Sequence, residues 1–196
     1  CGWVEKACGS VSAVFRAGII PSALEFIERD AIDWTLKYTD VKLQINDDVK
    51  AHLLIEVDGN DMDVLYKECE RIFEVMQEFE CGEILLADSE TQKNQLWQLR
   101  RAIGEAVKSN SIYKEEDTVV PRAELAKLLK GVKAIGKQYG FQSVCYGHAG
   151  DGNLHVNIIK GEMSDEDWNS KLTLGIREIF ELTKSLGGTL SGEHGI

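Results

Sequence analysis

The amino-acid sequence predicts an α+β fold, in which a largely antiparallel sheet packs against helices on one face. Short apolar runs with strand-like composition mix with longer segments in which apolar residues recur at helical spacing. Glycine-containing turns between strand-like runs favour hairpins, and therefore antiparallel pairing. The chain has 196 residues, of which 43% are hydrophobic and 28% charged, as in folded globular proteins. One domain over residues 1–196 accounts for this pattern.

Five segments have the apolar periodicity of amphipathic helices. Ser89 and Ser164 are expected N-cap residues. Helices are expected to end at Gly18, Gly140 and Gly188. The predicted helical segments are residues 10–18, 61–82, 89–110, 122–140 and 164–188.

The strand-like segments are shorter and lie between turn signals. The predicted extended segments are residues 20–29, 41–45, 51–59, 83–88, 113–121, the two arms of 141–161, and 189–194.

The formal net charge of −11 excludes some partners. Nucleic acids and anionic membranes bind basic surfaces, because counterion release needs lysine and arginine side chains. A small anionic substrate remains compatible with this charge, since a local arginine and lysine can bind it. No segment has the roughly 18 consecutive apolar residues of a transmembrane helix.

The ends of the chain suggest that it is part of a longer protein. It begins at Cys1 without a signal-peptide pattern, and it ends at Ile196 in a glycine-rich segment that would be expected to continue. Five cysteines without a CxxC pair argue against an even disulfide framework and favour a reducing compartment.

A glycine-rich stretch holds two of the four histidines around the pair Asp151-Gly152. A two-residue type I′ turn at this pair would place His148 directly opposite His155. Asn157 would point to the same face, because side chains alternate along a strand. The three side chains would form one polar patch, half of a metal site. A hairpin with two unrelated surface histidines is the alternative.

A further histidine lies in the motif Glu193-His194. Two imidazoles and a carboxylate are the usual ligands of a catalytic Zn²⁺ or a similar ion with an open coordination position. Neighbouring residues in an extended chain point to opposite sides, so one of this pair would bind the metal while the other acts as a base. Taken alone, the motif is more often an exposed pair.

Arg100 and Lys114 are candidates for binding an anionic substrate. Arginine can bind a carboxylate through two parallel hydrogen bonds, and lysine acts as a point charge. Each residue taken singly is more often a solvated charge on the surface.

Four motifs occur in order along the chain: "LWQLRRAIGEA", "YKEEDTVVP", "GHAGDGNLHVNI" and "GGTLSGEHGI". Together they resemble the C-terminal domain of the FAD-linked oxidases that act on 2-hydroxy acids, and the resemblance covers almost the whole chain. The family includes D-lactate dehydrogenase, the FAD subunit of glycolate oxidase and D-2-hydroxyglutarate dehydrogenase. The resemblance implies a ferredoxin-like α+β fold that serves as a substrate-binding cap on a separate N-terminal FAD domain.

The resemblance also assigns roles to seven residues. The implied ligands of a divalent metal, Zn or Mn, are His148, His155 and Glu193. The implied catalytic base is His194. The implied substrate-binding residues are Arg100, Lys114 and Asn157. Gly104 stands where some members carry a hydroxyl residue that contacts the substrate, and the chain stops before the family's C-terminal helix and tail.

The implied activity is oxidation of a 2-hydroxy acid, of the glycolate or D-lactate type, to a 2-oxo acid by hydride transfer to FAD. FAD would be bound mainly by the N-terminal domain of the same chain, so residues 1–196 alone are expected to be inactive. The expected partners are the 2-hydroxy acid, an iron–sulfur or quinone electron acceptor, and a second copy in a homodimer. The expected location is cytoplasmic, peripheral to the inner face of the membrane.

Two other functions use the same residues differently. A free-standing metal-dependent hydrolase would use two histidines and a carboxylate to activate water, with no flavin. A non-catalytic interaction domain would bind no metal, and its histidines would matter only for stability. Neither alternative explains Arg100 and Lys114 together with both histidine motifs.

Overall fold

Five strands pair into one open antiparallel sheet with the order β2-β1-β4-β5-β3. The structure is a computed structural model and describes residues 4–43 and 45–191. The strands are β1 (Ala23–Glu28), β2 (Ala51–Glu56), β3 (Tyr113–Val119), β4 (Gln142–Gly147) and β5 (Asn153–Ile159).

Strands β3 and β4 run parallel to each other, because both pair antiparallel with β5, which lies between them. The connection from β3 to β4 contains helix α5 (Leu125–Tyr139). This split β–α–β unit is the building block of ferredoxin-like folds. The antiparallel pair of β1 and β2 extends the sheet beyond β4. The predicted α+β class and the antiparallel sheet are confirmed.

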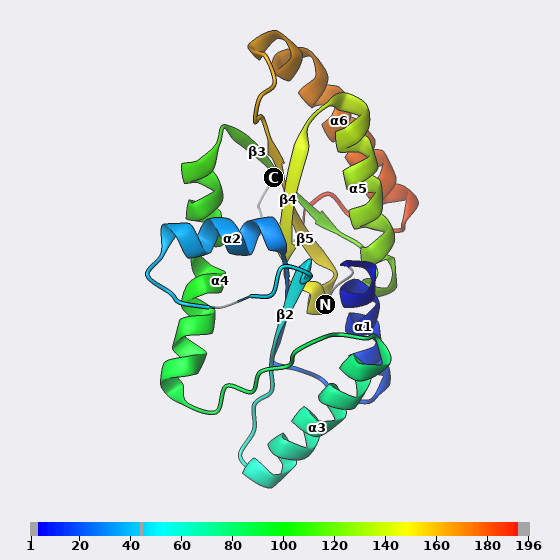
Figure 1. Cartoon of the computed structure of the whole chain (residues 1–196). Helices are drawn as coiled ribbons and strands as arrows, with labels where there is room; N and C mark the ends of the chain where they lie inside the picture. The colour runs from blue at the N-terminus through cyan, green and yellow to red at the C-terminus, as the bar shows by residue number, and fades with distance from the viewer. Residues whose placement is uncertain (1–3, 44, 192–196) are drawn as a thin grey trace.

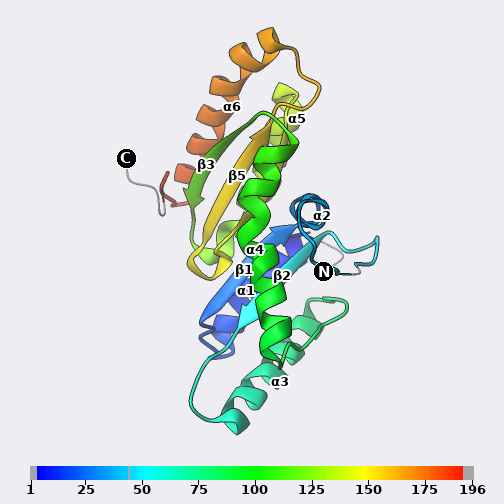
Figure 2. The ribbon, with the colours of Figure 1, turned by 90° about the vertical axis from the view of Figure 1, so that its left-hand side faces the viewer.

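Helices cover both faces of the sheet, as Figures 1 and 2 show. One face packs against α1 (Val4–Arg16), α5 and α6 (Asp165–Ser185), and α3 (Met62–Glu78) lies against α1. The other face is covered by α2 (Arg29–Tyr38) and α4 (Glu90–Asn110). The expected single layer of helices therefore describes only the larger layer. All seven residues of β5 are buried, and their side chains point alternately to the two faces of the sheet. This burial requires a layer of helices on each face.

The helix ends follow the signals in the sequence. The Ser89 hydroxyl accepts a hydrogen bond from the backbone N–H of Gln92, whose side chain returns to Ser89 in a capping box. Ser164 accepts from the backbone N–H of Asp167. Gly140 ends α5 in the left-handed conformation, with φ of 84°. Local capping chemistry thus placed these boundaries correctly.

Two predicted strands are wrong. The described residues of segment 41–45 and all of segment 83–88 have no regular secondary structure. In the first segment the apolar side chains pack over α2 and α4 instead of pairing in the sheet. In the second, Leu85 is 66% exposed and Leu86 is 57% exposed. An apolar run by itself specifies neither a strand partner nor, as Leu85 and Leu86 show, burial within this domain.

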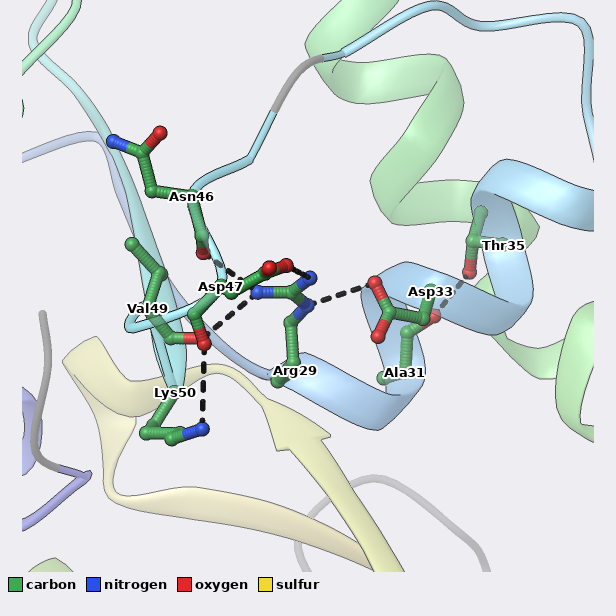
Figure 3. Close-up of polar contacts among 8 residues, drawn as sticks. All are labelled: Arg29, Ala31, Asp33, Thr35, Asn46, Asp47, Val49 and Lys50. Carbon is green, nitrogen blue, oxygen red and sulfur yellow. Dashed lines mark hydrogen bonds and ion pairs between the residues drawn. The ribbon is translucent and has the colours of Figure 1, made fainter.

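Helix α2 was not predicted at all, and Arg29 at its start fixes the loop that follows it (Figure 3). The guanidinium forms an ion pair with Asp33 at 2.8 Å and donates to the carbonyl oxygens of Asn46 at 2.8 Å and Val49 at 3.2 Å. These contacts of the Arg29 side chain hold the loop close to the start of α2.

The last predicted strand, 189–194, is represented by one antiparallel bridge between Thr189 and Val119. Its residues from 192 onward lie outside the described part of the chain. Among the described cysteines, Cys8, Cys69 and Cys145 are free thiols, whereas Cys81 is disulfide-bonded. Within residues 4–43 and 45–191, no helix has the length and apolar character needed to cross a membrane.

Candidate active site

The sheet face beneath α4 carries the polar residues of the candidate site. Register places His155 opposite Tyr146 on β4 and opposite Asp117 on β3. Asn157 lies opposite Glu115 on β3. Directly opposed residues share a face, so these side chains point toward α4. The opposite face of the same strands carries the apolar side chains that pack against α1 and α5.

The turn between β4 and β5 differs from the predicted two-residue turn. Tyr146, not His148, pairs with His155. The connection contains a short 3₁₀ helix over Ala149–Asp151, and the backbone N–H groups of Asp151 and Asn153 both donate to the carbonyl of His148, at 2.9 and 3.1 Å. His148 therefore lies in the turn, beyond the end of β4. The predicted register is wrong because the turn needs more residues than a type I′ turn has.

The two histidines still come together. Their ring centroids are 6.0 Å apart and the rings lie edge to face. Glycine at two positions allows this turn to form: a Cβ atom on Gly152, whose φ is 77°, would lie 1.9 Å from the carbonyl oxygen of Val120. A Cβ atom on Gly147 would lie 2.6 Å from the carbonyl oxygen of Asn153. Backbone from β3, β4 and β5 can meet here only because these side chains are absent.

Glu25 of β1 joins His148 to Arg100 of α4. One carboxylate oxygen, Oε1, lies 2.6 Å from Nδ1 of His148, and the other, Oε2, accepts from Nε of Arg100 at 2.7 Å. The Glu25 side chain is only 4% exposed, and that of Arg100 is 12% exposed. Hydrogen bonds between charged groups in such a buried setting are stronger than those in water. The pair therefore fixes α4 and the histidine turn relative to β1.

Carboxylates also surround His155. Its Nδ1 lies 3.2 Å from Oε1 of Glu115 and 3.9 Å from Oδ1 of Asp117. Asp117 in turn accepts a hydrogen bond of 2.6 Å from the amide of Asn153. His155, Asp117 and Asn153 are all buried. Each of the two histidines thus has a carboxylate at its Nδ1 atom.

Tyr146 packs between Arg100 and His155. The guanidinium carbon of Arg100 lies 5.1 Å from the centroid of the tyrosine ring, and the His155 ring centroid lies 5.3 Å from it. Burial, and then the charge of Glu115, raise the pKa of the Tyr146 hydroxyl to about 12. Tyr146 therefore stays a neutral hydroxyl within the site at physiological pH.

Asn157 is fully buried on the same face. Its amide nitrogen donates to the backbone carbonyl of Val144 at 3.3 Å, whereas its side-chain oxygen Oδ1 is buried without a hydrogen-bond partner among the described residues. Buried amide oxygens are nearly always paired in folded proteins. The Oδ1 atom of Asn153 on the same strand face is likewise buried without a hydrogen-bond partner among the described residues, so both amides could accept a hydrogen bond from a bound group.

The structure does not bring every predicted site residue to this place. Lys114 lies opposite Ile158 on the other face of the sheet, is 55% exposed, and forms an ion pair with Glu116 at 3.4 Å. Glu193 and His194 lie outside the described residues. Within residues 4–43 and 45–191, no cluster of three or more His, Cys, Asp or Glu side chains has an arrangement that would hold a metal ion. Arg100, His148, His155 and Asn157 are the predicted residues that come together on this face.

Sequence reasoning missed Glu25, Glu115, Asp117 and Tyr146. The alternation of side chains along "YKEEDTV" already places Glu115 and Asp117 on one face of a strand, but the sequence does not give the register against β5. Glu25 lies far from the histidines in sequence, and no local pattern marks it.

Comparison with known proteins identifies the family to which this arrangement belongs. The family described as "FAD linked oxidases, C-terminal domain" matches residues 2–196. The chain belongs to this family. Among relatives of the FAD-linked oxidase domain, a D-lactate dehydrogenase of Anaerostipes hadrus is 29% identical over 98% of this chain and 42% of its own length. The glycolate oxidase subunit GlcD of Bacillus subtilis (strain 168) is 32% identical over 98% of this chain and 40% of its own length.

A third relative of this FAD-linked oxidase domain, D-2-hydroxyglutarate dehydrogenase of Stutzerimonas stutzeri (strain A1501), is 31% identical over 89% of the chain and 38% of its own length. The solved structure of an alkyldihydroxyacetonephosphate synthase superposes with a TM-score of 0.54 at 13% identity, covering 97% of this chain and 39% of that one. At this identity the similarity supports the fold alone. The chain thus spans about 40% of the length of the curated relatives that it matches.

Proposed function

We propose that this chain is the substrate-binding domain of an FAD-dependent 2-hydroxy-acid dehydrogenase, which oxidises a 2-hydroxy acid of the glycolate or D-lactate type to a 2-oxo acid. The observation that carries the proposal is the grouping of Arg100, His148, His155 and Asn157 on one sheet face of an FAD-linked oxidase domain. Relatives more than twice as long as this chain support an FAD-binding domain elsewhere in the same protein.

Arg100 is the residue that we assign to the substrate carboxylate. Glu25 binds its Nε atom, and the two terminal nitrogens of the guanidinium are the pair that would hold a carboxylate through two parallel hydrogen bonds. The Tyr146 ring supports the guanidinium from one side. Lys114 lies on the other sheet face, so we assign carboxylate binding in this domain to Arg100 alone.

The two described imidazoles suit a divalent metal. Metal-bound histidines commonly donate their second ring nitrogen to a carboxylate, and both His148 and His155 have a carboxylate at Nδ1, from Glu25 and Glu115. Their Nε2 atoms are the ones that would bind Zn²⁺ or Mn²⁺, with Glu193 as the third ligand. A bound divalent ion would polarise the 2-hydroxyl group and lower its pKa.

Proton transfer is assigned to His194, which would accept the proton of the 2-hydroxyl group. When bound, FAD supplies the acceptor for the hydride that leaves C2 of the substrate. The residues of this chain then orient the hydroxy acid: Arg100 holds its carboxylate, and Asn157 offers its buried amide oxygen to the hydroxyl side of the molecule. Carboxylate and hydroxyl are thereby held at two points, which restricts how the hydroxy acid can turn within the site.

The test uses the full-length flavoprotein. Glycolate, D-lactate, L-lactate and D-2-hydroxyglutarate are each mixed with the oxidised enzyme without oxygen, and bleaching of the flavin absorbance is followed. We expect at least one of these acids to reduce the flavin, and Arg100→Leu to lower kcat/KM about a hundredfold or more through loss of a charged hydrogen-bonded pair.

Arg101→Leu is the matched control. Arg101 is the next residue of α4 and is exposed, so its loss should leave kcat/KM within about twofold of the wild-type value. Flavin that none of the four acids reduces would contradict the proposal. Hydrolysis of an ester or amide with added Zn²⁺, without flavin reduction, would favour a metal-dependent hydrolase instead.

A further inference from the structure

Two buried glutamates on β1 offer a contrast. Glu25 and Glu28 are 3% and 6% exposed, and they point to opposite faces of the sheet. Glu28 accepts from Nζ of Lys133 at 2.7 Å and from the backbone N–H of Cys145 at 2.7 Å. This is a structural ion pair, since neither partner belongs to the candidate active site.

Glu25 is bound differently. Its two oxygens contact two side chains from separate elements, Arg100 of α4 and His148 of the β4–β5 turn, at 2.7 and 2.6 Å. Both partners are residues to which the proposed function gives a direct role, one toward the substrate carboxylate and one toward the metal. A planar carboxylate that is held at both oxygens restricts the rotation of both partners.

The histidine turn holds its backbone and the His148 ring through different contacts. Its backbone carbonyl is held by the N–H groups of Asp151 and Asn153, and Arg122 donates to the carbonyl of Gly150. These contacts fix the backbone of the turn. The His148 side chain is 37% exposed, and the contact of Glu25 with its Nδ1 atom restrains the orientation of the ring and leaves Nε2 as the nitrogen that faces away from Glu25.

We propose that Glu25 is a positioning residue, which aligns the Arg100 guanidinium for the substrate carboxylate and the His148 imidazole for the metal. The inference rests on the proposed function, because it assigns Glu25 no contact of its own with substrate or metal. It predicts that substrate binding and metal binding both depend on the Glu25 carboxylate, which contacts Arg100 and His148 but neither ligand.

The first experiment measures metal affinity without turnover. Full-length protein is stripped of metal, and Zn²⁺ and Mn²⁺ are titrated in competition with a chelating dye. We expect Glu25→Gln to weaken metal binding by 10- to 100-fold, as removal of a carboxylate behind a metal-bound histidine does in other sites. Glu28→Gln, on the same strand and equally buried, should leave the metal affinity within about twofold.

The second experiment tests the coupling to Arg100. KM for the best 2-hydroxy acid is measured for Glu25→Gln, Arg100→Leu and the double variant. If Glu25 acts partly through Arg100, Glu25→Gln raises KM in the wild-type background and raises it by a smaller factor in the Arg100→Leu background, where only the route through His148 remains. A purely structural role would give additive effects, and Glu28→Gln would reproduce them.

The results separate the two levels of the inference. Wild-type metal affinity and KM in Glu25→Gln, together with large effects of Arg100→Leu and His148→Ala, would overturn the positioning role and leave the proposed function standing. Silent Arg100→Leu and His148→Ala variants would overturn the proposed function and the role of Glu25 with it. Should Glu25→Gln not fold, Glu25→Asp carries the test, because its shorter carboxylate cannot reach both partners; unchanged metal affinity in that variant would equally overturn the role.

Discussion

The Tyr146 ring lies opposite the His155 imidazole across β4 and β5, with 5.3 Å between the ring centroids. Arg100 lies over the same tyrosine ring. We expect Tyr146→Leu to lower the free energy of unfolding by about 1–3 kcal/mol, because both ring contacts and part of the buried area are lost. Tyr146→Phe keeps the ring and should cost less than about half of that. Urea unfolding of both variants checks this, and equal losses would show that the hydroxyl, not the ring, is the stabilising group.

The Glu28–Lys133 pair should be strongly coupled. Lys133→Met leaves the Glu28 carboxylate buried with only a backbone N–H donor, and we expect about 2–4 kcal/mol of destabilisation. Burial raises the pKa of Glu28 in the present structure, against the charge of Lys133, which lowers it. In the double variant Glu28→Gln with Lys133→Met, part of the stability should return, because no unpaired charge remains. Additive losses in a double-mutant cycle of chemical unfolding would contradict this coupling.

The turn that holds His148 should not tolerate a side chain at Gly152. Gly152→Ala combines a φ of 77° with a Cβ atom 1.9 Å from the carbonyl oxygen of Val120, so β3 and β5 must move apart. We expect a loss of more than about 3 kcal/mol, or failure to fold. Gly161→Ala is the control: its φ is 51°, but no atom lies within 4 Å of the added Cβ, so about 1 kcal/mol is expected. Thermal unfolding of the two variants gives the comparison, and similar losses would show that backbone conformation alone is responsible.

His52 of β2 should make stability depend on pH. Burial is the main cause that lowers the pKa of His52 from 6.5 to about 4, and positive charge that includes Arg29 adds to it. Between these two values the unfolded chain binds a proton that the folded chain does not. The stability that depends on a neutral His52 is therefore fully present above about pH 6.5. It is lost as the pH falls toward 4, which lowers the free energy of unfolding by about 3 kcal/mol at most.

The measurement for His52 is the free energy of unfolding of wild type and His52→Gln at several values between pH 7.5 and 4.5, a range chosen to cover roughly this window. The variant should lose less stability than the wild type on acidification. Parallel curves would mean that other groups account for the pH dependence.

Much of the fold is encoded locally in the sequence. Amphipathic spacing and capping residues placed α3, α4, α5 and α6, and alternation with turn signals placed the five strands. These signals work because helix caps and strand alternation depend on neighbouring residues alone. The two false strands and the missed helix α2 come from short segments, in which apolar residues satisfy a loop, a helix or a strand equally well until a packing partner is present.

The candidate site also combines features that the sequence encodes locally with features that depend on the tertiary structure. The sequence by itself determined that His148, His155 and Asn157 lie close together, because they belong to adjacent parts of one hairpin, and motif order brought Arg100 into the same hypothesis. Only the tertiary structure decided that His155 faces Tyr146, that Lys114 lies on the far face, and that Glu25 connects Arg100 to His148. Strand register and contacts between distant segments depend on the packing of the whole sheet, which no local pattern contains.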